Sequence, residues 1–297
     1  MKPFGKMKTR LVIEAKIRAE TALHVGCGGS LEPSGTDSPV IKTADGKPFI
    51  PGSSIKGALR SFAEQLLRTM GEQNIKGPEP PPESGVWACE PFAGSCCLDK
   101  KVSPSEAGLQ DLQLVEERYR EQGPARVYLR ARNIVDGRLD DTSYACDLFE
   151  WACYACRLFG CQYFAGRIAV ADAFADGEVA TQVRDGVGID RDTGTAKEGI
   201  KYDFEVVEPG AEFNLRIVCE NLDEPEEAFF AHLLKLWRDE GLRLGGKTTR
   251  GLGLTRLRDI KVQRCDADAL VGVSEPEKVE LDTLADKLSE HWRRGDA

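Results

Sequence analysis

Residues 51–71 decide the fold, and they read Pro-Gly-Ser-Ser-Ile-Lys-Gly-Ala-Leu-Arg-Ser-Phe-Ala-Glu-Gln-Leu-Leu-Arg-Thr-Met-Gly. Ser53 and Ser54 are both suitable N-cap residues, and Gly71 is of the residue type that commonly ends a helix. Between them, apolar side chains recur three and four positions apart, which predicts a long helix with one buried face. These apolar positions are Ile55, Ala58, Leu59, Phe62, Leu66, Leu67 and Met70.

The segments on either side of this helix predict a sheet on which it can pack. Apolar and charged residues alternate over 11–19, and this alternation indicates a half-buried strand. A second helix is predicted at about 225–240, because Asp223 and Pro225 are typical of a helix start and Gly241 of a helix end. Further strands are predicted at 38–42, 167–171, 213–219 and 254–262.

The order strand, strand, helix, strands, helix, strand predicts an α+β fold of the ferredoxin-like or RRM-like class, in which two helices back a sheet. Sheets of this class commonly bind single-stranded RNA. Three segments are added to this core. They are an irregular, partly proline-rich insertion up to about residue 160, a long hairpin at 186–207 and a tail whose amphipathic helix starts at Ser274 with Glu277 in a capping box.

The charge of the chain is uneven. The net charge is −9 over 297 residues, yet residues 1–70 carry 11 basic and 6 acidic side chains, and residues 241–264 carry 7 and 1. Two basic segments from opposite ends of the chain can converge on one face and attract a phosphate backbone. The alternative is that these charges are ordinary solvated surface.

The sequence shows no sign of membrane insertion or secretion. It has no run of about 18 apolar residues, the length needed to cross a bilayer. The first eight residues lack the apolar core of a signal peptide. We therefore expect a cytoplasmic protein with no membrane partner.

Residues 241–248 match the phosphate-binding pattern G-x-x-x-x-G-K-[ST]. A true P-loop follows a strand and opens a helix, whereas here a helix precedes and a strand follows, so a P-loop NTPase is only a remote alternative. Gly245 and Gly246 still let backbone N–H groups approach a phosphate, and Lys247 and Arg250 supply charge. An ordinary helix-to-strand turn is the other interpretation.

A second candidate anion site lies at the start of the helix at 51–71. Ser53 and Ser54 offer hydroxyl groups, Lys56 offers a positive charge, and the first turn of a helix has free N–H groups. The alternative is a plain helix cap.

Cysteines are concentrated in the insertion, which with its last residue, Cys161, holds seven of the ten. Clustered cysteines in a cytoplasmic protein favour a metal site over disulfides, and four thiolates around Zn²⁺ can staple an insertion too irregular to build its own core. Buried free thiols are the alternative. The predicted ligands are Cys146, Cys153, Cys156 and Cys161, with Cys89, Cys96 and Cys97 as other possible ligands.

Six segments together resemble the ordered motifs of the RAMP superfamily, and most closely the repeated backbone subunit of type III CRISPR effector complexes, of the Csm kind. The resemblance covers about residues 10–262. The segments are Leu-His-Val-Gly at 23–26, Asp-Ser-Pro-Val at 37–40, Pro-Phe-Ile-Pro-Gly-Ser-Ser-Ile-Lys-Gly-Ala-Leu-Arg at 48–60, Cys-Arg-Leu-Phe-Gly at 156–160, Gly-Ile-Asp-Arg-Asp-Thr-Gly-Thr-Ala at 188–196 and Leu-Gly-Gly-Lys-Thr-Thr-Arg-Gly-Leu-Gly at 244–253.

The resemblance implies an RRM-like palm (1–70 and 162–262), a thumb hairpin at about 186–204 and an insertion that acts as a lid (71–161). The cysteines predict that this lid contains zinc, and the residue pattern of the tail predicts a C-terminal amphipathic helix (263–297). The resemblance also implies that copies stack along a CRISPR guide RNA and that each thumb wedges into the guide–target duplex. The implied partners are guide RNA, complementary target RNA, copies of the chain or other RAMP subunits, and a large effector subunit.

In that family, an aspartate before the Ser-Pro-Val strand is required for metal-dependent cleavage of target RNA, and Asp37 stands at this position. The resemblance thus implies an endoribonuclease, a hydrolase of antiviral defence, that uses Mg²⁺ or a similar ion. A turn role is the alternative for Asp37, and a scaffold that only binds guide RNA is the alternative for the chain. The implied RNA-binding residues are His24, Ser53, Ser54, Lys56, Arg60, Arg191, Gly245, Gly246, Lys247 and Arg250.

Overall fold

The computed structural model describes residues 5–26, 28, 36–72, 75–76, 87–90, 96–109 and 119–294. Its main body is an eight-stranded sheet of order β15-β16-β1-β14-β11-β2, in which β10 also pairs with β14 and β17 with β16. The strands are β1 (Arg10–Ala19), β2 (Phe49–Ile50), β10 (Ile168–Val170), β11 (Ala173–Ala175), β14 (Glu212–Glu220), β15 (Leu242–Arg243), β16 (Leu254–Cys265) and β17 (Glu277–Val279).

The central strands have ferredoxin-like connectivity. Strand β1 lies between β14 and β16 and is antiparallel to both, with Ile13 opposite Ile217 on one side and Val262 on the other. Strands β10 and β11 lie beyond β14 and pair with it in the antiparallel sense. The predicted α+β class with an antiparallel sheet is confirmed.

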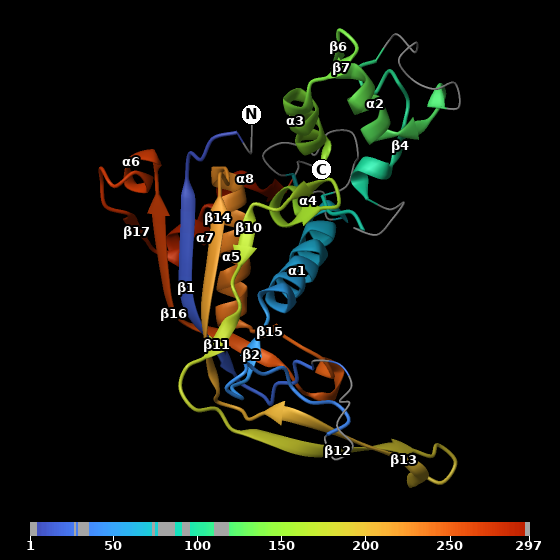
Figure 1. The fold of residues 1–297 in the computed structure, drawn as a ribbon, viewed down its shortest axis with the longest axis vertical. Helices are drawn as coiled ribbons and strands as arrows, with labels where there is room; N and C mark the ends of the chain where they lie inside the picture. Colours follow the sequence, from blue (N-terminus) through green and yellow to red (C-terminus); the bar gives the residue numbers. More distant parts are fainter. Residues whose placement is uncertain are drawn as a thin grey trace.

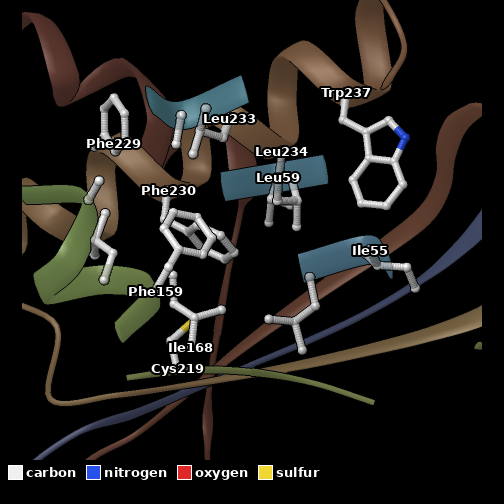
Figure 2. Packing of buried hydrophobic residues seen from close by; sticks show 14 of the residues in the cluster. Ile55, Leu59, Phe159, Ile168, Cys219, Phe229, Phe230, Leu233, Leu234 and Trp237 are labelled. Atoms are coloured by element: carbon white, nitrogen blue, oxygen red, sulfur yellow. The ribbon is translucent and has the colours of Figure 1, made fainter. Parts of the chain in front are cut away.

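Two long helices cover one face of this sheet, namely α1 (Gly52–Glu72) and α5 (Glu224–Asp239) (Figure 1). Their apolar side chains meet those of the strands, as Figure 2 shows for Leu59, Phe230 and Ile168. The indole N–H of the fully buried Trp237 donates to the Thr255 hydroxyl at 3.0 Å, which satisfies the one polar atom of that ring. The core therefore lies between the sheet and the two helices.

The predicted cap of α1 is wrong. The helix begins at Gly52, and its amide donates to Asp172 Oδ1 at 2.7 Å, so a carboxylate from the β10–β11 loop takes the place of a serine cap. Gly52 is required there, because a Cβ atom would lie 2.3 Å from the carbonyl oxygen of Val170. The helix also continues through Gly71 to Glu72. By contrast, the predicted cap of α5 at Asp223 is confirmed as a capping box with Glu226.

We expect Asp172→Ala to lower the free energy of unfolding by about 1 kcal/mol, the usual cost of losing an N-cap acceptor. Urea denaturation of the full chain measures this change. Asp172→Asn keeps an oxygen acceptor and should recover part of the loss. If both variants unfold at the wild-type urea concentration, this contact does not cap the helix.

The hairpin extends away from the sheet, at the end opposite the insertion (Figure 1). It consists of β12 (Thr181–Ile189) and β13 (Ala196–Val207), so its first strand begins earlier than the predicted hairpin. At the turn of the hairpin, the Asp190 carboxylate accepts bonds from the amides of Asp192 and Thr193. Four large apolar side chains of the hairpin are exposed: Val183, Val187, Ile189 and Ile200.

The insertion is more ordered than the sequence suggests. It contains a small core of its own, formed by Val102, Ala107, Leu109, Ala125, Tyr128 and Ala131. The prolines at 78–82 lie outside the described residues. The described elements are β3 (Ile75–Lys76), the 3-10 helix η1 (Cys97–Asp99), β4 (Lys101–Val102), β5 (Gly123–Pro124), α2 (Ala125–Arg132), β6 (Ile134–Val135), β7 (Arg138–Leu139), α3 (Asp141–Trp151), α4 (Tyr154–Phe159), β8 (Gly160–Cys161) and β9 (Phe164–Ala165).

The tail is not the single amphipathic helix that the sequence predicts. Glu277 lies in β17, where it pairs with Arg264 of β16, because this edge of the sheet offers free backbone groups to the chain. The apolar positions Leu281, Leu284 and Trp292 are nevertheless buried. The other tail elements are α6 (Ala267–Leu270), α7 (Leu281–Asp286), α8 (Leu288–His291) and β18 (Arg293–Arg294). Among the described residues, no helix has the length and apolar character needed to cross a membrane.

Candidate functional site

Four segments that are distant in sequence meet at the base of the hairpin. Leu23 exchanges backbone hydrogen bonds of 3.0 and 2.8 Å with Val207 of β13. On its other side, the carbonyl oxygens of Ala22 and His24 accept bonds from the amides of Gly253 and Gly246, each at 2.8 Å. The segment at 22–24 therefore lies between the hairpin and the glycine-rich loop at 244–253. The segment around residue 38 joins the group through the Glu205 amide, which donates to the Ser38 carbonyl at 3.0 Å.

Asp37 is exposed in this group and forms a reciprocal pair with Asp203 of β13. The Asp37 amide donates to Asp203 Oδ1 at 2.7 Å, and the Asp203 amide donates to Asp37 Oδ2 at 3.0 Å. Each carboxylate therefore accepts from the amide of the other residue at the base of the hairpin. Sequence analysis missed Asp203, which is 166 residues from Asp37 and carries no local signal of this contact.

His24 is only 4% exposed and holds two of these segments together. Its Nδ1 lies 2.6 Å from the carbonyl oxygen of Glu205, and its Nε2 lies 3.2 Å from the Ser38 hydroxyl. Because a carbonyl oxygen can only accept, Nδ1 carries the proton and Nε2 is free to accept from Ser38. The ring also packs edge-on against Phe204, with the ring centroids 5.8 Å apart. The structure thus places His24 inside the fold rather than on an open surface.

Glu205 and Lys42 form an ion pair beneath the same segment, with 2.6 Å between Nζ and Oε1. The second carboxylate oxygen of Glu205 accepts from the Val40 amide at 3.1 Å. Burial raises the pKa of Glu205. The hydrogen bonds from Lys42, Thr181 and the Val40 amide together lower it by more, so the pKa of this carboxyl lies below its ordinary range. The charged pair stabilises the segment that carries Asp37, and sequence analysis did not find it.

The glycine-rich loop needs its glycines for close backbone approach. Gly245 has φ +78°, and a Cβ atom there would lie 2.2 Å from the carbonyl oxygen of His24. Gly253 has φ +82° and would bring a Cβ atom to 2.2 Å from the Leu244 carbonyl oxygen. The amide of Gly246 is used by His24, so this particular N–H does not face a ligand.

The two cations of this loop lie on aromatic side chains of β13. Lys247 Nζ lies 4.6 Å from the centroid of the Phe204 ring, and the Arg250 guanidinium donates to the hydroxyl of Tyr202. Tyr202 and Phe204 themselves stack at 6.1 Å. In the described part of the chain neither cation has a carboxylate within ion-pair distance, so both charges remain available to an anion.

The surroundings of Lys247 differ from those of a P-loop lysine. The loop follows α5 and β15, and after it the chain forms the short 3-10 helix η4 (Thr248–Arg250) and then β16. In the residues described by the structure, no α-helix opens at Lys247 to direct N–H groups at a nucleotide phosphate. This connectivity speaks against the NTPase alternative, as its sequence context did.

The start of α1 is less open than the sequence suggests. The Gly52 amide is used by Asp172, Ser53 is exposed and Ser54 is half-buried. Lys56 is half-buried, and burial, followed by the charge of Arg60, lowers its pKa. Arg191 is exposed and lies in the turn between β12 and β13, at the tip of the hairpin.

Arg60 points into the fold. Its guanidinium donates to Glu64 Oε1 and to the Gly160 carbonyl oxygen, both at 2.7 Å, and its Nη2 lies 3.7 Å from Cys156 Sγ. The structure therefore places this side chain at the junction of α1, α4 and β8.

Buried cysteines form a second site at that junction. The sulfurs of Cys89, Cys96, Cys97 and Cys156 all lie within 4.8 Å of one another. Cys89 and Cys156 are 3.5 Å apart, close to the roughly 3.8 Å that a tetrahedral zinc site with Zn–S bonds of about 2.3 Å requires. Distances of this size also exclude a disulfide, whose S–S bond is about 2.05 Å. The donor set fits zinc.

The predicted ligand set overlaps this group at one position. Cys156 belongs to it, Cys153 adjoins it with its sulfur 3.6 Å from that of Cys89, and Cys161 contacts Cys156 and Cys96. Cys146 lies half-buried on α3, and among the described cysteines it is not part of this group. Cys89, Cys96 and Cys97, which the sequence offers as other possible ligands, come from the segment before η1 and from the first residue of η1.

A ferredoxin-like sheet with a projecting hairpin and a glycine-rich loop at its base defines the class of this protein. The chain belongs to the RAMP superfamily, whose profile matches residues 16–256.

Within that superfamily, the chain is similar to proteins named CRISPR system Cms endoribonuclease Csm3. It is 27% identical to the one from Methanocaldococcus jannaschii over 261 residues, which cover 86% of this chain and 82% of that protein. It is 36% identical to the one from Enterococcus italicus over 123 residues, which cover 38% of this chain and 58% of that protein.

Proposed function

We propose that this chain is the guide-RNA-binding backbone subunit of a type III CRISPR effector, and that it cleaves complementary target RNA with Asp37 as the catalytic carboxylate. The similarity to proteins named Csm3 endoribonuclease supports the reaction class. The observation that carries the proposal is the exposed Asp37 carboxylate beside Asp203 at the base of the hairpin.

The chemistry requires little of the protein, because RNA carries its own nucleophile in the 2′-hydroxyl. A carboxylate can take the proton of this hydroxyl directly or hold a divalent ion beside it. Mg²⁺ is commonly held by one or two carboxylates together with water, and Asp37 and Asp203 offer two. Such an ion, when bound, would stabilise negative charge on the phosphate. In this proposal Asp37 acts on the proton and the hairpin holds the target strand away from regular helical geometry.

The guide strand is proposed to lie along the glycine-rich loop. Lys247 and Arg250 present positive charge there, next to the stacked rings of Tyr202 and Phe204. The remaining proposed contacts are His24, Ser53, Ser54, Lys56, Arg60, Arg191, Gly245 and Gly246. Two of these act through the fold, since His24 and Arg60 make their contacts inside the protein.

Lys247→Ala should weaken binding of guide RNA and lower the salt dependence of that binding. Losing one phosphate contact on a single strand reduces the slope of log K against log salt by about 0.7. Fluorescence anisotropy with labelled guide RNA at several salt concentrations measures both quantities, and Lys56→Ala tests the second cation in the same way. Lys278→Ala, an exposed lysine on β17, is the matched control. An unchanged slope for Lys247→Ala would place the guide elsewhere.

A non-catalytic scaffold is the second candidate function, and one observation favours it. Asp37 Oδ2 accepts a bond from the Asp203 amide, so Asp37 also has a structural role in fixing its loop to the hairpin. Asp37→Asn separates the two roles, because an amide oxygen still accepts this bond but cannot take a proton or hold a metal ion as a carboxylate does. If Asp37→Asn cleaves target RNA at the wild-type rate, the scaffold function is the better account.

The exposed apolar residues of the hairpin fit the proposed partners. Val183, Val187, Ile189 and Ile200 are all exposed in the single chain. Exposed apolar groups of this kind commonly mark contacts with other macromolecules. We propose that they contact the guide–target duplex or a neighbouring copy, and that the large effector subunit binds elsewhere on the assembled backbone.

A further inference from the structure

The cysteine site contains more sulfur than a single zinc ion can bind. Six cysteines, not four, form one connected cluster of sulfurs, and they come from the segment before η1, from η1 and from α4 with its flanking residues. All six are buried except Cys161, which is half-buried. A tetrahedral zinc site takes four ligands, so a single ion leaves two of the six thiols without a metal.

One tetrahedron is complete without Cys96 and Cys161. Cys153 Sγ lies 3.6 Å from Cys89 Sγ, which in turn lies 3.5 Å from Cys156 Sγ. Cys97 contacts each of these three sulfurs, and Cys153 contacts Cys156. Every pair among these four sulfurs is therefore in contact, as expected around one ion.

A second group of four shares two of the same sulfurs. Cys96 contacts Cys89, Cys97, Cys156 and Cys161, and Cys161 also contacts Cys156, so five of the six pairs among Cys89, Cys96, Cys156 and Cys161 are in contact. The members found in both groups are Cys89 and Cys156, and Cys156 contacts all five of the other cysteines. We propose that the six thiolates hold two zinc ions, with Cys89 and Cys156 bridging them, Cys97 and Cys153 completing one ion and Cys96 and Cys161 completing the other.

The surroundings offset part of the charge of such a cluster. Six thiolates and two Zn²⁺ ions leave a net charge of −2, and Arg60 Nη2 lies 3.7 Å from the bridging Cys156 Sγ. Backbone amides also point at the sulfurs, since the Cys89 amide donates to Cys153 Sγ at 3.4 Å and the Cys153 amide donates to Cys97 Sγ at 3.3 Å. Hydrogen bonds of this kind orient metal ligands. The cluster would thus fasten the insertion to α1 through Arg60, independently of the proposed function.

The number of metal ions per chain tests the proposal directly. Elemental analysis and native mass spectrometry of the full chain, purified with zinc, should give two ions. Cys161→Ser removes a terminal ligand of one ion only and should reduce the count to one, whereas the control Cys146→Ser should keep two. In protein loaded with ¹¹³Cd, NMR should show two cadmium signals and two cysteines coupled to both ions.

Other outcomes overturn the two-ion cluster. One zinc ion in the wild-type chain, or one cadmium signal, would mean a single site with two unused thiols. Iron and sulfide in place of zinc would mean an iron–sulfur cluster. A wild-type count that survives in Cys161→Ser would remove that residue from the ligand set. If Cys161→Ser does not fold, the cadmium spectrum of the wild-type chain alone decides the question.

Discussion

Cys156→Ser should unfold the insertion and lower the melting temperature of the chain by about 10 °C or more. Cys156 is fully buried, and its sulfur lies with those of Cys89, Cys96 and Cys97 in the group that fits a metal ion. Structural zinc contributes roughly 10–16 kcal/mol of apparent binding free energy in zinc-finger peptides, so losing a central ligand removes a large part of the stability of this region. Differential scanning calorimetry with and without a zinc chelator measures the effect.

The control for this prediction is Cys146→Ser, which changes a half-buried thiol outside the group. It should melt within a few degrees of the wild type. Chelation of the wild-type chain should reproduce the effect of Cys156→Ser, because both remove the ion. Purified wild-type chain without any bound metal, or a Cys156→Ser variant that melts like wild type, would show that the buried thiols pack without an ion.

Asp37→Ala should slow cleavage of target RNA by a factor of about 10² to 10⁴, the usual contribution of a positioned acid or base. Binding of the target should remain, because Asp37 is exposed and forms one reciprocal contact with Asp203. Single-turnover cleavage by the assembled complex gives the rate, and a filter-binding titration gives the affinity. A matched control is Asp192→Ala, which removes an exposed carboxylate in the turn of the same hairpin.

Asp203→Ala distinguishes two roles of Asp203, namely holding the Asp37 loop in place and holding the metal ion. If Asp203 only holds the Asp37 loop, cleavage should fall but should retain its dependence on Mg²⁺ concentration. If both carboxylates hold the ion, Asp203→Ala should require a higher Mg²⁺ concentration for half-maximal cleavage. Asp37→Ala with wild-type cleavage would contradict both versions.

The elements of the palm could be predicted from the sequence because their signals are local. Strand β1 alternates strictly, with Ile13 and Ile17 buried in the core and Glu14 and Arg18 on the other face. The end of β16 and the start of α1 are predicted less accurately, because local signals do not decide where these elements end or begin. The acceptor for the first amide of α1 is the carboxylate of Asp172, which lies 120 residues further along the chain.

The candidate site shows the limit of local signals more clearly. The alternation of β13 places Tyr202 and Phe204 on one face and Asp203 and Glu205 on the other, which the sequence alone allows one to predict. Which residue each of them meets is set by topology, because Asp37 lies 166 residues before Asp203. The sequence likewise leaves open which cysteines lie together, since Cys89, Cys96 and Cys97 are far from Cys156 in sequence.

The pattern of cuts on a guide-complementary, end-labelled RNA tests the proposed function most directly. The complex assembled with wild-type chain should cut at regularly spaced positions, one for each copy along the guide. All of these cuts should vanish with Asp37→Ala, and with EDTA in the wild-type complex, while the target stays bound. Cuts that persist at the same positions in the Asp37→Ala complex would contradict the account and assign the nuclease to another subunit.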